Sequence, residues 1–173
     1  MMIIDREMLW RQFGAAIDML AEALRDCPDE LWERPLWDDL PDQWVAAGFA
    51  RFWYLGYHAL FWLDLYLTGA EEGFAPPPPF DLVEMAAGEA LPRTYTRDEL
   101  LGYLEHCRRR CREVICGLTP EQASRRCRFS WGELSFAELQ LYNLRHVQEH
   151  GAQLRMFRGQ QARLATGWVA RAT

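Results

Sequence analysis

Apolar side chains recur every three or four residues in four long stretches of the chain, which is the spacing of one face of an α-helix. The first stretch, for example, carries Leu9, Phe13, Ile17 and Leu20 at this spacing. The pattern predicts long helices over residues 4–27, 42–68, 96–118 and 135–158.

Short polar motifs mark the expected starts of these helices. Thr96 with Glu99, and Ser135 with Glu138, have the three-residue spacing of a capping box, in which each side chain bonds to the backbone of the other residue. Asp42 is the expected N-cap of the second helix, because its carboxylate can accept from free backbone N–H groups of the first turn.

The connection between the second and third predicted helices is long, residues 69–95, and contains four consecutive prolines at 76–79. Such a run favours an extended strap, and a link of this length can cross a bundle and reposition the next helix. No stretch shows a strand pattern long enough for a sheet. The sequence therefore predicts an all-α four-helix bundle with a long crossover connection, in one domain over 1–173. The tail either packs Trp168 against this bundle or is loose.

Composition and charge narrow the choice of partners. Half of the 173 residues are apolar, the formal net charge is −6 and the isoelectric point is about 5.3. A nucleic-acid-binding surface should show a basic excess, so no nucleic-acid partner is expected. Two short arginine clusters, at 108–112 and 125–128, are interpreted as solvated faces.

One apolar stretch, residues 49–67, imitates a membrane span, but Arg51, His58 and Asp64 interrupt it. Its uninterrupted runs are far shorter than the ~20 residues that a span needs, so no membrane insertion is expected. The N-terminus has no long apolar region typical of a signal peptide. Five cysteines without a CxxC motif indicate reduced thiols in a cytoplasmic protein.

The candidate chemistry lies in the last long helix. His146 and His150 are one helical turn apart, within about 40° of each other and ~6 Å apart along the axis, so that both rings could reach one metal ion. The pair lies in the middle of an apolar stripe, where unpaired imidazoles are costly to bury. Either hydrogen bonds or a metal must satisfy them. Asn143 and Gln153 flank the pair and could orient a ring or a bound ligand.

A third ligand is available in the second helix. His58 lies near its middle among apolar and aromatic residues, whereas His106 falls off the apolar stripe of its helix and is expected to face solvent. Three imidazoles with an open position form the arrangement of catalytic zinc sites, although imidazole also suits nickel, copper and iron. Tyr54, Phe61 and Trp62 are candidate walls of a cofactor or substrate pocket, or else core residues.

Two other motifs were considered. HVQEH, residues 146–150, matches the H-x-x-E-H pattern of inverted zinc peptidases. That scheme needs Glu149 near the metal, but Glu149 points roughly 80° away from the histidines, and no acidic residue follows to act as a further ligand. Cys107 and Cys111 are also one turn apart, and they are interpreted as small core residues.

The segments GYHALFWLDLYLTG (56–69) and LYNLRHVQEHGAQLRMF (141–157) resemble the DinB-like superfamily of four-helix-bundle proteins. The resemblance covers roughly residues 4–158. It implies that His58, His146 and His150 bind a divalent metal ion, zinc or nickel. Relatives include transferases and isomerases that use low-molecular-weight thiols such as bacillithiol, mycothiol or glutathione, and the resemblance also suggests a homodimer.

These observations lead to one main hypothesis and two alternatives. The main hypothesis is a metal-dependent enzyme, a thiol-dependent transferase or a hydrolase, that acts on a small-molecule substrate at a three-histidine site. The first alternative is a non-catalytic bundle that binds a metal or small ligand or pairs with itself. The second is a metal-free bundle whose histidines are polar core residues.

Overall fold

The computed structural model describes residues 5–37, 48–86, 93–164 and 167–173. In chain order the elements are α1 (Arg6–Arg25), η1 (Asp29–Leu31), α3 (Phe52–Thr68), η2 (Val83–Met85), α4 (Arg97–Cys116), α5 (Pro120–Ser124), β1 (Arg126–Phe129), β2 (Gly132–Ser135) and α6 (Phe136–Ala162). The two η elements are short 3-10 helices. The predicted dominance of helix is confirmed, although a small sheet is also present.

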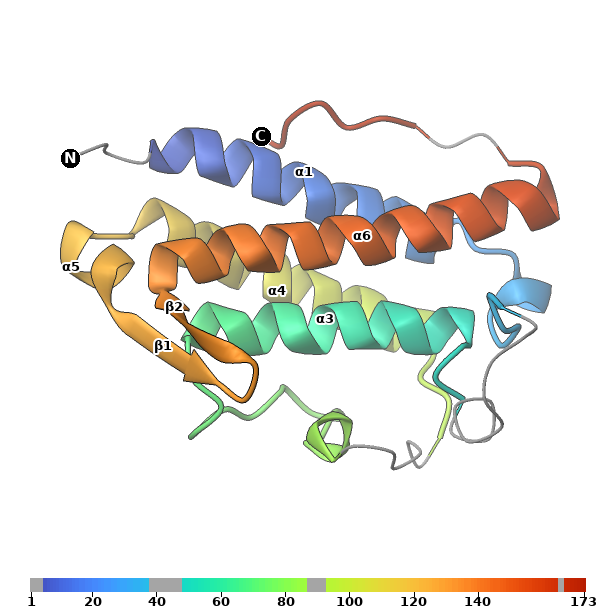
Figure 1. The fold of residues 1–173 in the computed structure, drawn as a ribbon. Helices are drawn as coiled ribbons and strands as arrows, with labels where there is room; N and C mark the ends of the chain where they lie inside the picture. Colours follow the sequence, from blue (N-terminus) through green and yellow to red (C-terminus); the bar gives the residue numbers. More distant parts are fainter. Residues whose placement is uncertain (1–4, 38–47, 87–92, 165–166) are drawn as a thin grey trace.

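The four long helices lie side by side around an apolar core (Figure 1). Helices α1 and α3 each pack against both α4 and α6. Leu20, Leu60, Leu104 and Leu139, one from each long helix, are almost completely buried between them. Removing such side chains from water is the main force that holds the helices together. Helix α3 therefore has two buried contact faces, one toward α4 and one toward α6.

The starts of the third and fourth long helices agree with their sequence signals. Thr96 is the N-cap of α4 and forms a reciprocal capping box with Glu99. The Ser135 hydroxyl accepts from the backbone N–H of Glu138 at the start of α6. These bonds satisfy backbone donors that the first helical turn leaves free.

The second long helix is shorter than predicted. Helix α3 begins at Phe52, with Arg51 as its N-cap, and the turn before it contains Gly48 at a φ of 76°. A positive φ interrupts a right-handed helix, so the prediction of one continuous helix over 42–68 is wrong. The proposed N-cap, Asp42, lies outside the described residues.

A two-stranded antiparallel hairpin precedes α6, and it corrects the prediction of an all-α fold with no strand pattern long enough for a sheet. Its four-residue strands are too short to stand out by alternation in the sequence. In the structure the side chains of the two strands nevertheless alternate between a buried and an exposed face. Cys127 pairs with Leu134 across the strands and both are buried, whereas Arg126 and Arg128 point outward and bond to Glu133.

The long connection between α3 and α4 packs along α3 (Figure 1). The ring of Phe74 contacts Phe61 edge-on, with 5.3 Å between centroids. Phe80 stacks against Tyr57 of α3 at 5.8 Å and against Tyr103 of α4 at 4.5 Å. These apolar contacts hold the connection against the helices and bring η2 beside α3.

The interpretation of residues 108–112 as a solvated face is wrong for two arginines. Arg108 bonds to Asp18 of α1 at 2.7 Å, and Arg110 bonds to the buried Asp64 of α3. His106 was expected to face solvent, but its side chain is only 29% exposed and its Nε2 lies 3.7 Å from Asp64 Oδ2. This part of α4 therefore ties the helix to its neighbours.

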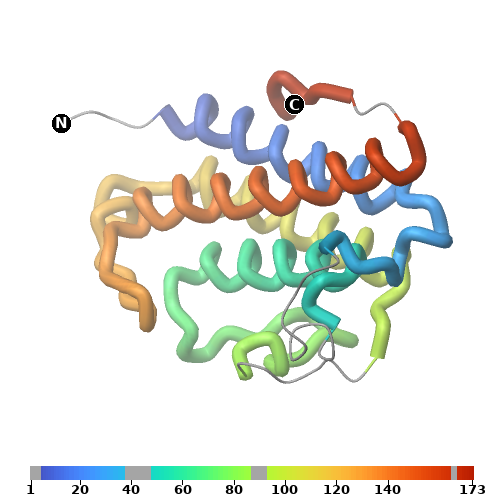
Figure 2. Tube along the Cα trace, turned by 45° about the vertical axis from the view of Figure 1, so that its right-hand side comes forward, coloured from blue at the N-terminus to red at the C-terminus, as the bar shows by residue number. Residues whose placement is uncertain are grey.

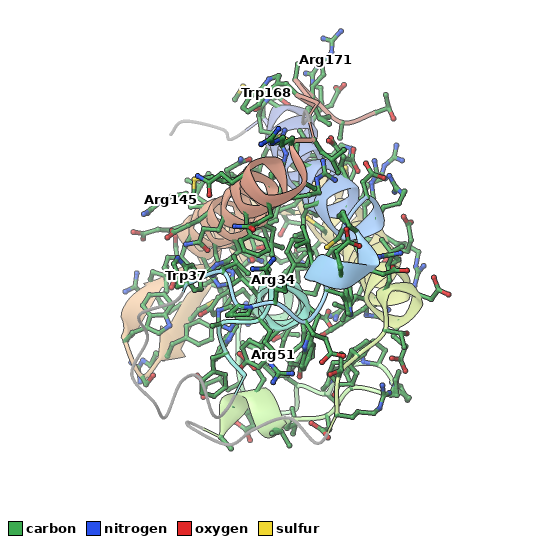
Figure 3. The ribbon with its side chains drawn as sticks, turned by 90° about the vertical axis from the view of Figure 1, so that its right-hand side faces the viewer. Arg34, Trp37, Arg51, Arg145, Trp168 and Arg171 are labelled. Atoms are coloured by element: carbon green, nitrogen blue, oxygen red, sulfur yellow. The ribbon has the colours of Figure 1, made fainter. Side chains whose placement is uncertain are left out.

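The C-terminal segment runs back over α1 (Figure 2). The backbone N–H of Ala172 donates to the carbonyl of Arg11 at 2.8 Å, and the Ala172 side chain is buried. Trp168 is 75% exposed and lies at the periphery (Figure 3). The tail thus packs through Ala172 and not through Trp168. Within the described part of the chain, no helix combines the length and apolarity needed to cross a membrane.

Candidate metal centre

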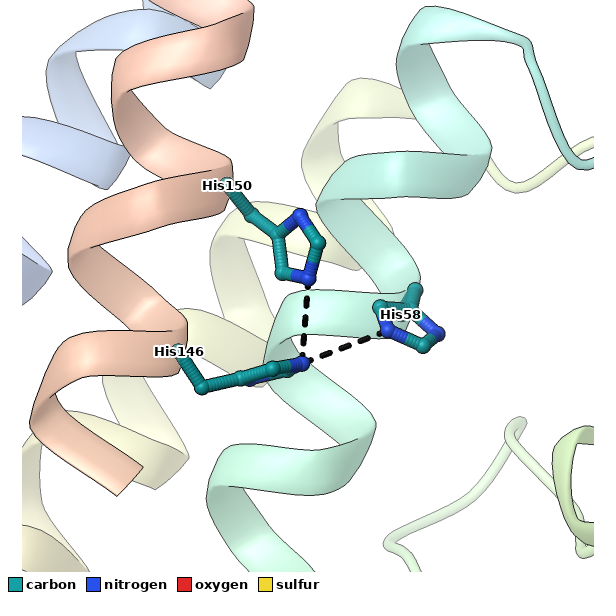
Figure 4. A group of neighbouring side chains, drawn as sticks. All are labelled: His58, His146 and His150. Carbon is teal, nitrogen blue, oxygen red and sulfur yellow. Dashed lines mark hydrogen bonds between the residues drawn. The ribbon is translucent and has the colours of Figure 1, made fainter. Parts of the chain in front are cut away.

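Three histidines converge between α3 and α6 (Figure 4). Nε2 of His146 lies 3.3 Å from Nε2 of His58 and 3.1 Å from Nε2 of His150. One nitrogen of each ring lies within 4.8 Å of the other two. The structure thus brings together the three residues that the sequence singled out, although 88 positions separate His58 from His146.

The axial register of α3 and α6 produces this convergence. The amide nitrogen of Asn143 donates to the carbonyl of Leu63 at 3.1 Å, and that of Gln140 donates to the carbonyl of Tyr66 at 2.9 Å. Both side chains are fully buried, so that their hydrogen bonds to the α3 backbone are costly to lose. Asn143 was predicted to orient an imidazole or a ligand, but this amide hydrogen bond goes to the backbone of α3.

A buried carboxylate holds the outer side of His58. Oε1 of Glu84, in η2, lies 2.6 Å from Nδ1 of His58, and the Glu84 side chain is only 4% exposed. The hydroxyl of Tyr54 donates to Oε2 of Glu84 at 2.5 Å, and the indole N–H of Trp62 donates to Oε1 at 3.3 Å. Because the carboxylate accepts, Nδ1 of His58 carries the proton, and the lone pair of Nε2 faces the other histidines.

Sequence reasoning did not identify Glu84. It lies in a connection without helical or strand periodicity, which also contains the exposed acids Glu71 and Glu72. Its one distinguishing signal is its place in the short apolar run LVEM, residues 82–85. Tyr54 and Trp62 were predicted as cofactor or pocket residues, and in the structure both bond to this carboxylate.

Gln153 holds His150 in a similar way. Its Oε1 lies 2.8 Å from Nδ1 of His150. With the amide oxygen as acceptor, Nδ1 carries the proton and the lone pair of Nε2 faces inward. Nδ1 of His146 is buried and has no hydrogen-bond partner among the described residues. Two of the three rings are therefore oriented by a bond at their outer nitrogen.

The three inner nitrogens are better placed to bind a cation than to form hydrogen bonds with one another. Two lone pairs, from His58 and His150, face Nε2 of His146, which has at most one proton to offer. A tetrahedral ion with Zn–N bonds of 2.0–2.1 Å would hold its nitrogen ligands about 3.3–3.4 Å apart. The observed 3.1 and 3.3 Å are close to this spacing. The cluster could hold a divalent metal ion and leave a coordination position free.

Burial keeps two of these rings, those of His146 and His150, in the neutral form. Burial, with contributions from the nearby His150 and His58, lowers the pKa of His146 to about 2. Burial also lowers the pKa of His150, as does His58, while the hydrogen bond that Nδ1 of His150 donates to Gln153 opposes the shift. Neutral imidazole is the form that binds a metal, so a metal need not compete with protons for these two rings at neutral pH.

The other candidates from the sequence lie away from the cluster. Phe61 is fully buried and contacts Phe74 of the connection. Glu149 is exposed, which disfavours a peptidase-type role. Cys107 and Cys111 are fully buried in α4, and burial raises the pKa of both thiols, as expected for core residues.

Comparison with known proteins gives a family match and a similar fold. The sequence model of the DinB superfamily matches residues 12–154. Among solved structures, the fold is similar to that of a DinB-like protein from Bacillus subtilis, with a TM-score of 0.58, 9% identity, and coverage of 94% of this chain and 97% of that chain. At this identity the likeness concerns the fold alone. A comparison with curated proteins finds no match.

Proposed function

Because the chain belongs to the DinB superfamily, we propose that it is a metal-dependent enzyme that binds one divalent ion, zinc or nickel, through His58, His146 and His150. The observation that carries the proposal is the convergence of three Nε2 atoms, two of them from rings oriented by Glu84 and Gln153. The family resemblance implies the same three ligands.

The proposal includes the architecture around the site. The four long helices form a four-helix bundle of the DinB type, and the connection over 69–95 is its crossover. Two observations support this arrangement: α1 and α3 each pack against both α4 and α6, and the connection is fastened by the buried Phe74 and Phe80.

The number of protein ligands indicates the kind of chemistry. Catalytic zinc sites use three protein ligands and keep one position open, whereas structural sites are closed by four. When bound, the ion would act as a Lewis acid that lowers the pKa of a small-molecule thiol or of water at the open position. The proposed reactions are therefore thiol-dependent group transfer or hydrolysis of a small-molecule substrate.

The chain's own residues prepare the ligands. Glu84 and Gln153 would keep the Nε2 atoms of His58 and His150 pointing inward, and the carboxylate would also raise the basicity of its histidine. Trp62 lies edge-on to His58, with 6.4 Å between ring centroids, and would limit the movement of that ring. Tyr54 holds Glu84 in place through its hydroxyl.

Partners and location follow as further parts of the proposal. All five cysteines are free, which fits a reducing compartment such as the cytoplasm. The acidic net charge of −6 supports a small-molecule partner and not a nucleic acid. The homodimer implied by the family resemblance stays a prediction.

Metal analysis followed by activity assays tests the proposal. Protein purified without an affinity tag should contain about one equivalent of zinc or nickel per chain. His146→Ala should lose the ion, and the matched control His106→Ala, which removes the fourth histidine, should keep it. Turnover with bacillithiol, mycothiol or glutathione, or in hydrolysis assays, should disappear with the ion. Metal without turnover would indicate a non-catalytic binding protein, and a metal-free native protein would contradict the proposal.

A further inference from the structure

A series of aromatic rings borders the histidine cluster and extends from it to the hairpin. We call this surface the aromatic shelf, and its members are Trp62, Tyr66, Phe129, Trp131 and Tyr142. Trp62 lies 6.4 Å from His58, and Tyr66 lies 6.3 Å from His146, both measured between ring centroids. These two rings contact each other at 5.4 Å, so the inner end of the shelf lines the candidate metal centre.

The outer end of the shelf is built on Tyr66. This ring contacts Phe129 at 5.3 Å, Tyr142 at 5.4 Å and Trp131 at 6.3 Å between centroids. Trp131 stacks against Phe129 and against Tyr142, with interplanar angles of 4° and 20°. Tyr66 therefore contacts both Trp131 and His146 and lies between them. One small molecule can span the width of a single tyrosine ring.

Trp131 is not needed to fasten the hairpin to the rest of the protein. Cys127 and Leu134, paired across the two strands, are 1% and 7% exposed and anchor the hairpin in the core. The backbone N–H of Phe136 closes the base of the hairpin by donating to the carbonyl of Arg125 at 2.8 Å. Trp131 is 47% exposed although its orientation is set by stacking. An aromatic ring that is both oriented and exposed is a prepared binding surface.

The charges of the hairpin lie on its other face. Arg126 and Arg128 both bond to Glu133, at 2.8 and 2.6 Å. The polar atoms of the shelf rings are limited to hydroxyl and indole N–H groups. This chemistry favours a flat, uncharged ligand group that stacks on the rings. It disfavours an anionic ligand group, because the arginines that could pair with it lie on the other face of the hairpin.

From this arrangement, and resting on the proposed function, we propose that the aromatic shelf binds a planar aromatic group of the substrate while the other end of the same molecule reaches the metal. The substrate class is thus a small molecule with an aromatic ring and a metal-binding or electrophilic head group. Trp131 is the specificity-determining residue, because it is the most exposed ring of the shelf.

Two probes that differ only in the ring test this inference. Acetohydroxamate and benzohydroxamate carry the same metal-binding group, on a methyl and on a phenyl group. Calorimetry on zinc-loaded protein should show tighter binding of benzohydroxamate. Trp131→Ala should weaken benzohydroxamate roughly five- to tenfold, the scale of one lost aromatic contact, and leave acetohydroxamate unchanged. Tyr142→Leu is a second variant, which keeps the test informative should Trp131→Ala fold poorly.

The control is Trp168→Ala, because Trp168 is 75% exposed in the tail, and it should alter neither affinity. Equal affinities of the native protein for the two probes, or an unchanged ratio in both shelf variants, would overturn the shelf and leave the metal site intact. Failure of acetohydroxamate to bind the fully zinc-loaded protein would instead contradict the open coordination position, and with it both proposals.

Discussion

Helix α3 carries a polar cluster on each of its two contact faces, one around a buried carboxylate and one of half-buried histidines, and the two clusters are built differently. Toward α4, the fully buried Asp64 accepts hydrogen bonds from Arg110 and, at 3.3 Å, from the Tyr103 hydroxyl, with His106 at 3.7 Å. Toward α6, His58 meets two further histidines. The first cluster joins unlike groups and the second joins like groups.

This difference indicates which cluster needs an additional component. A carboxylate with a guanidinium and a hydroxyl satisfies its hydrogen-bonding and charge requirements within the chain. In the histidine cluster, two lone pairs face Nε2 of His146, which can donate at most one proton. The cluster therefore requires a further donor or a cation, and no other group in the described part of the chain supplies a donor. A half-buried cluster of like groups therefore points to a ligand, whereas a buried cluster of complementary groups satisfies its own hydrogen bonds and charges.

The largest expected effect separates the two clusters by metal removal. A ligand that binds only the folded state at a thousandfold excess over its Kd stabilises by about 4 kcal/mol, so a strong chelator should lower the thermal midpoint by on the order of 10 °C. Asp64→Asn should leave this response intact, and His146→Ala should abolish it. Differential scanning fluorimetry with and without chelator measures both. If chelator leaves the thermal midpoint of the native protein unchanged, the histidine cluster does not depend on a metal and the contrast between the two clusters is wrong.

The next effect concerns the cluster toward α4. Asp64→Asn keeps the shape but removes the charge that pairs with Arg110, and we expect a loss of about 2–3 kcal/mol in the free energy of unfolding. Arg110 is 30% exposed, so part of its charge can still be solvated, which limits the loss. Urea denaturation gives the value, and metal competition should show unchanged affinity. A fall in metal affinity as large as that of a ligand variant would mean that the two faces of α3 are not independent.

Glu84 should affect metal affinity and have less effect on stability. Removing an outer partner of a metal-binding histidine usually weakens metal binding about 10–100-fold, and we expect this range for Glu84→Ala. Glu84→Gln should weaken metal binding less, because the amide oxygen can still accept a hydrogen bond from Nδ1 of His58. Glu71→Ala, at an exposed acid of the same connection, is the matched control. Competition with a chromogenic chelator measures each Kd; equal values for Glu84→Ala and Glu71→Ala would exclude a role for Glu84.

The smallest expected effect is a pH dependence of the metal-free protein. The depressed pKa values of His146 and His150 mean that the unfolded chain binds protons below about pH 6.5 that the folded chain does not. The shift of His146 alone should therefore lower stability by about 2 kcal/mol between pH 7 and pH 5, and His150 adds to this loss. Burial raises the pKa of Asp64, against the opposing effect of Arg110, so this carboxyl should not add to the acid loss. Burial lowers the pKa of His106 in the same cluster, so His106 should add to the loss in the same direction as His146 and His150. Urea titrations of His146→Ala should show a shallower pH profile than the native chain, and identical profiles would contradict this origin.

The parts of the fold that the sequence predicts are those with local and repeated signals. The starts of α4 and α6 follow from Thr96 and Ser135, whose side chains bond to backbone three residues on. The turn at Gly48 and the hairpin escaped detection. A single residue with positive φ leaves an apolar pattern unbroken, and two strands of four residues alternate too briefly to be recognised.

The candidate site divides in the same way. His146 and His150 are neighbours on one helix, so their common face can be read from spacing alone, and His58 stood out as an interior histidine. Glu84 could not be found so easily, because its position depends on how a connection without periodicity packs. Asp64 was noted only as a charge inside an apolar run. Its partner Arg110 lies 46 positions away, and only packing reveals such a pair.

The central claim is that the three imidazoles share one metal ion, and anomalous diffraction from crystals of tag-free protein tests it most directly. The account predicts a single strong peak between α3 and α6, about 2.0–2.1 Å from Nε2 of His58, His146 and His150 if the ion is zinc. A map with no peak there, although the crystals were grown with metal in excess, or a peak bound to other residues, would contradict it.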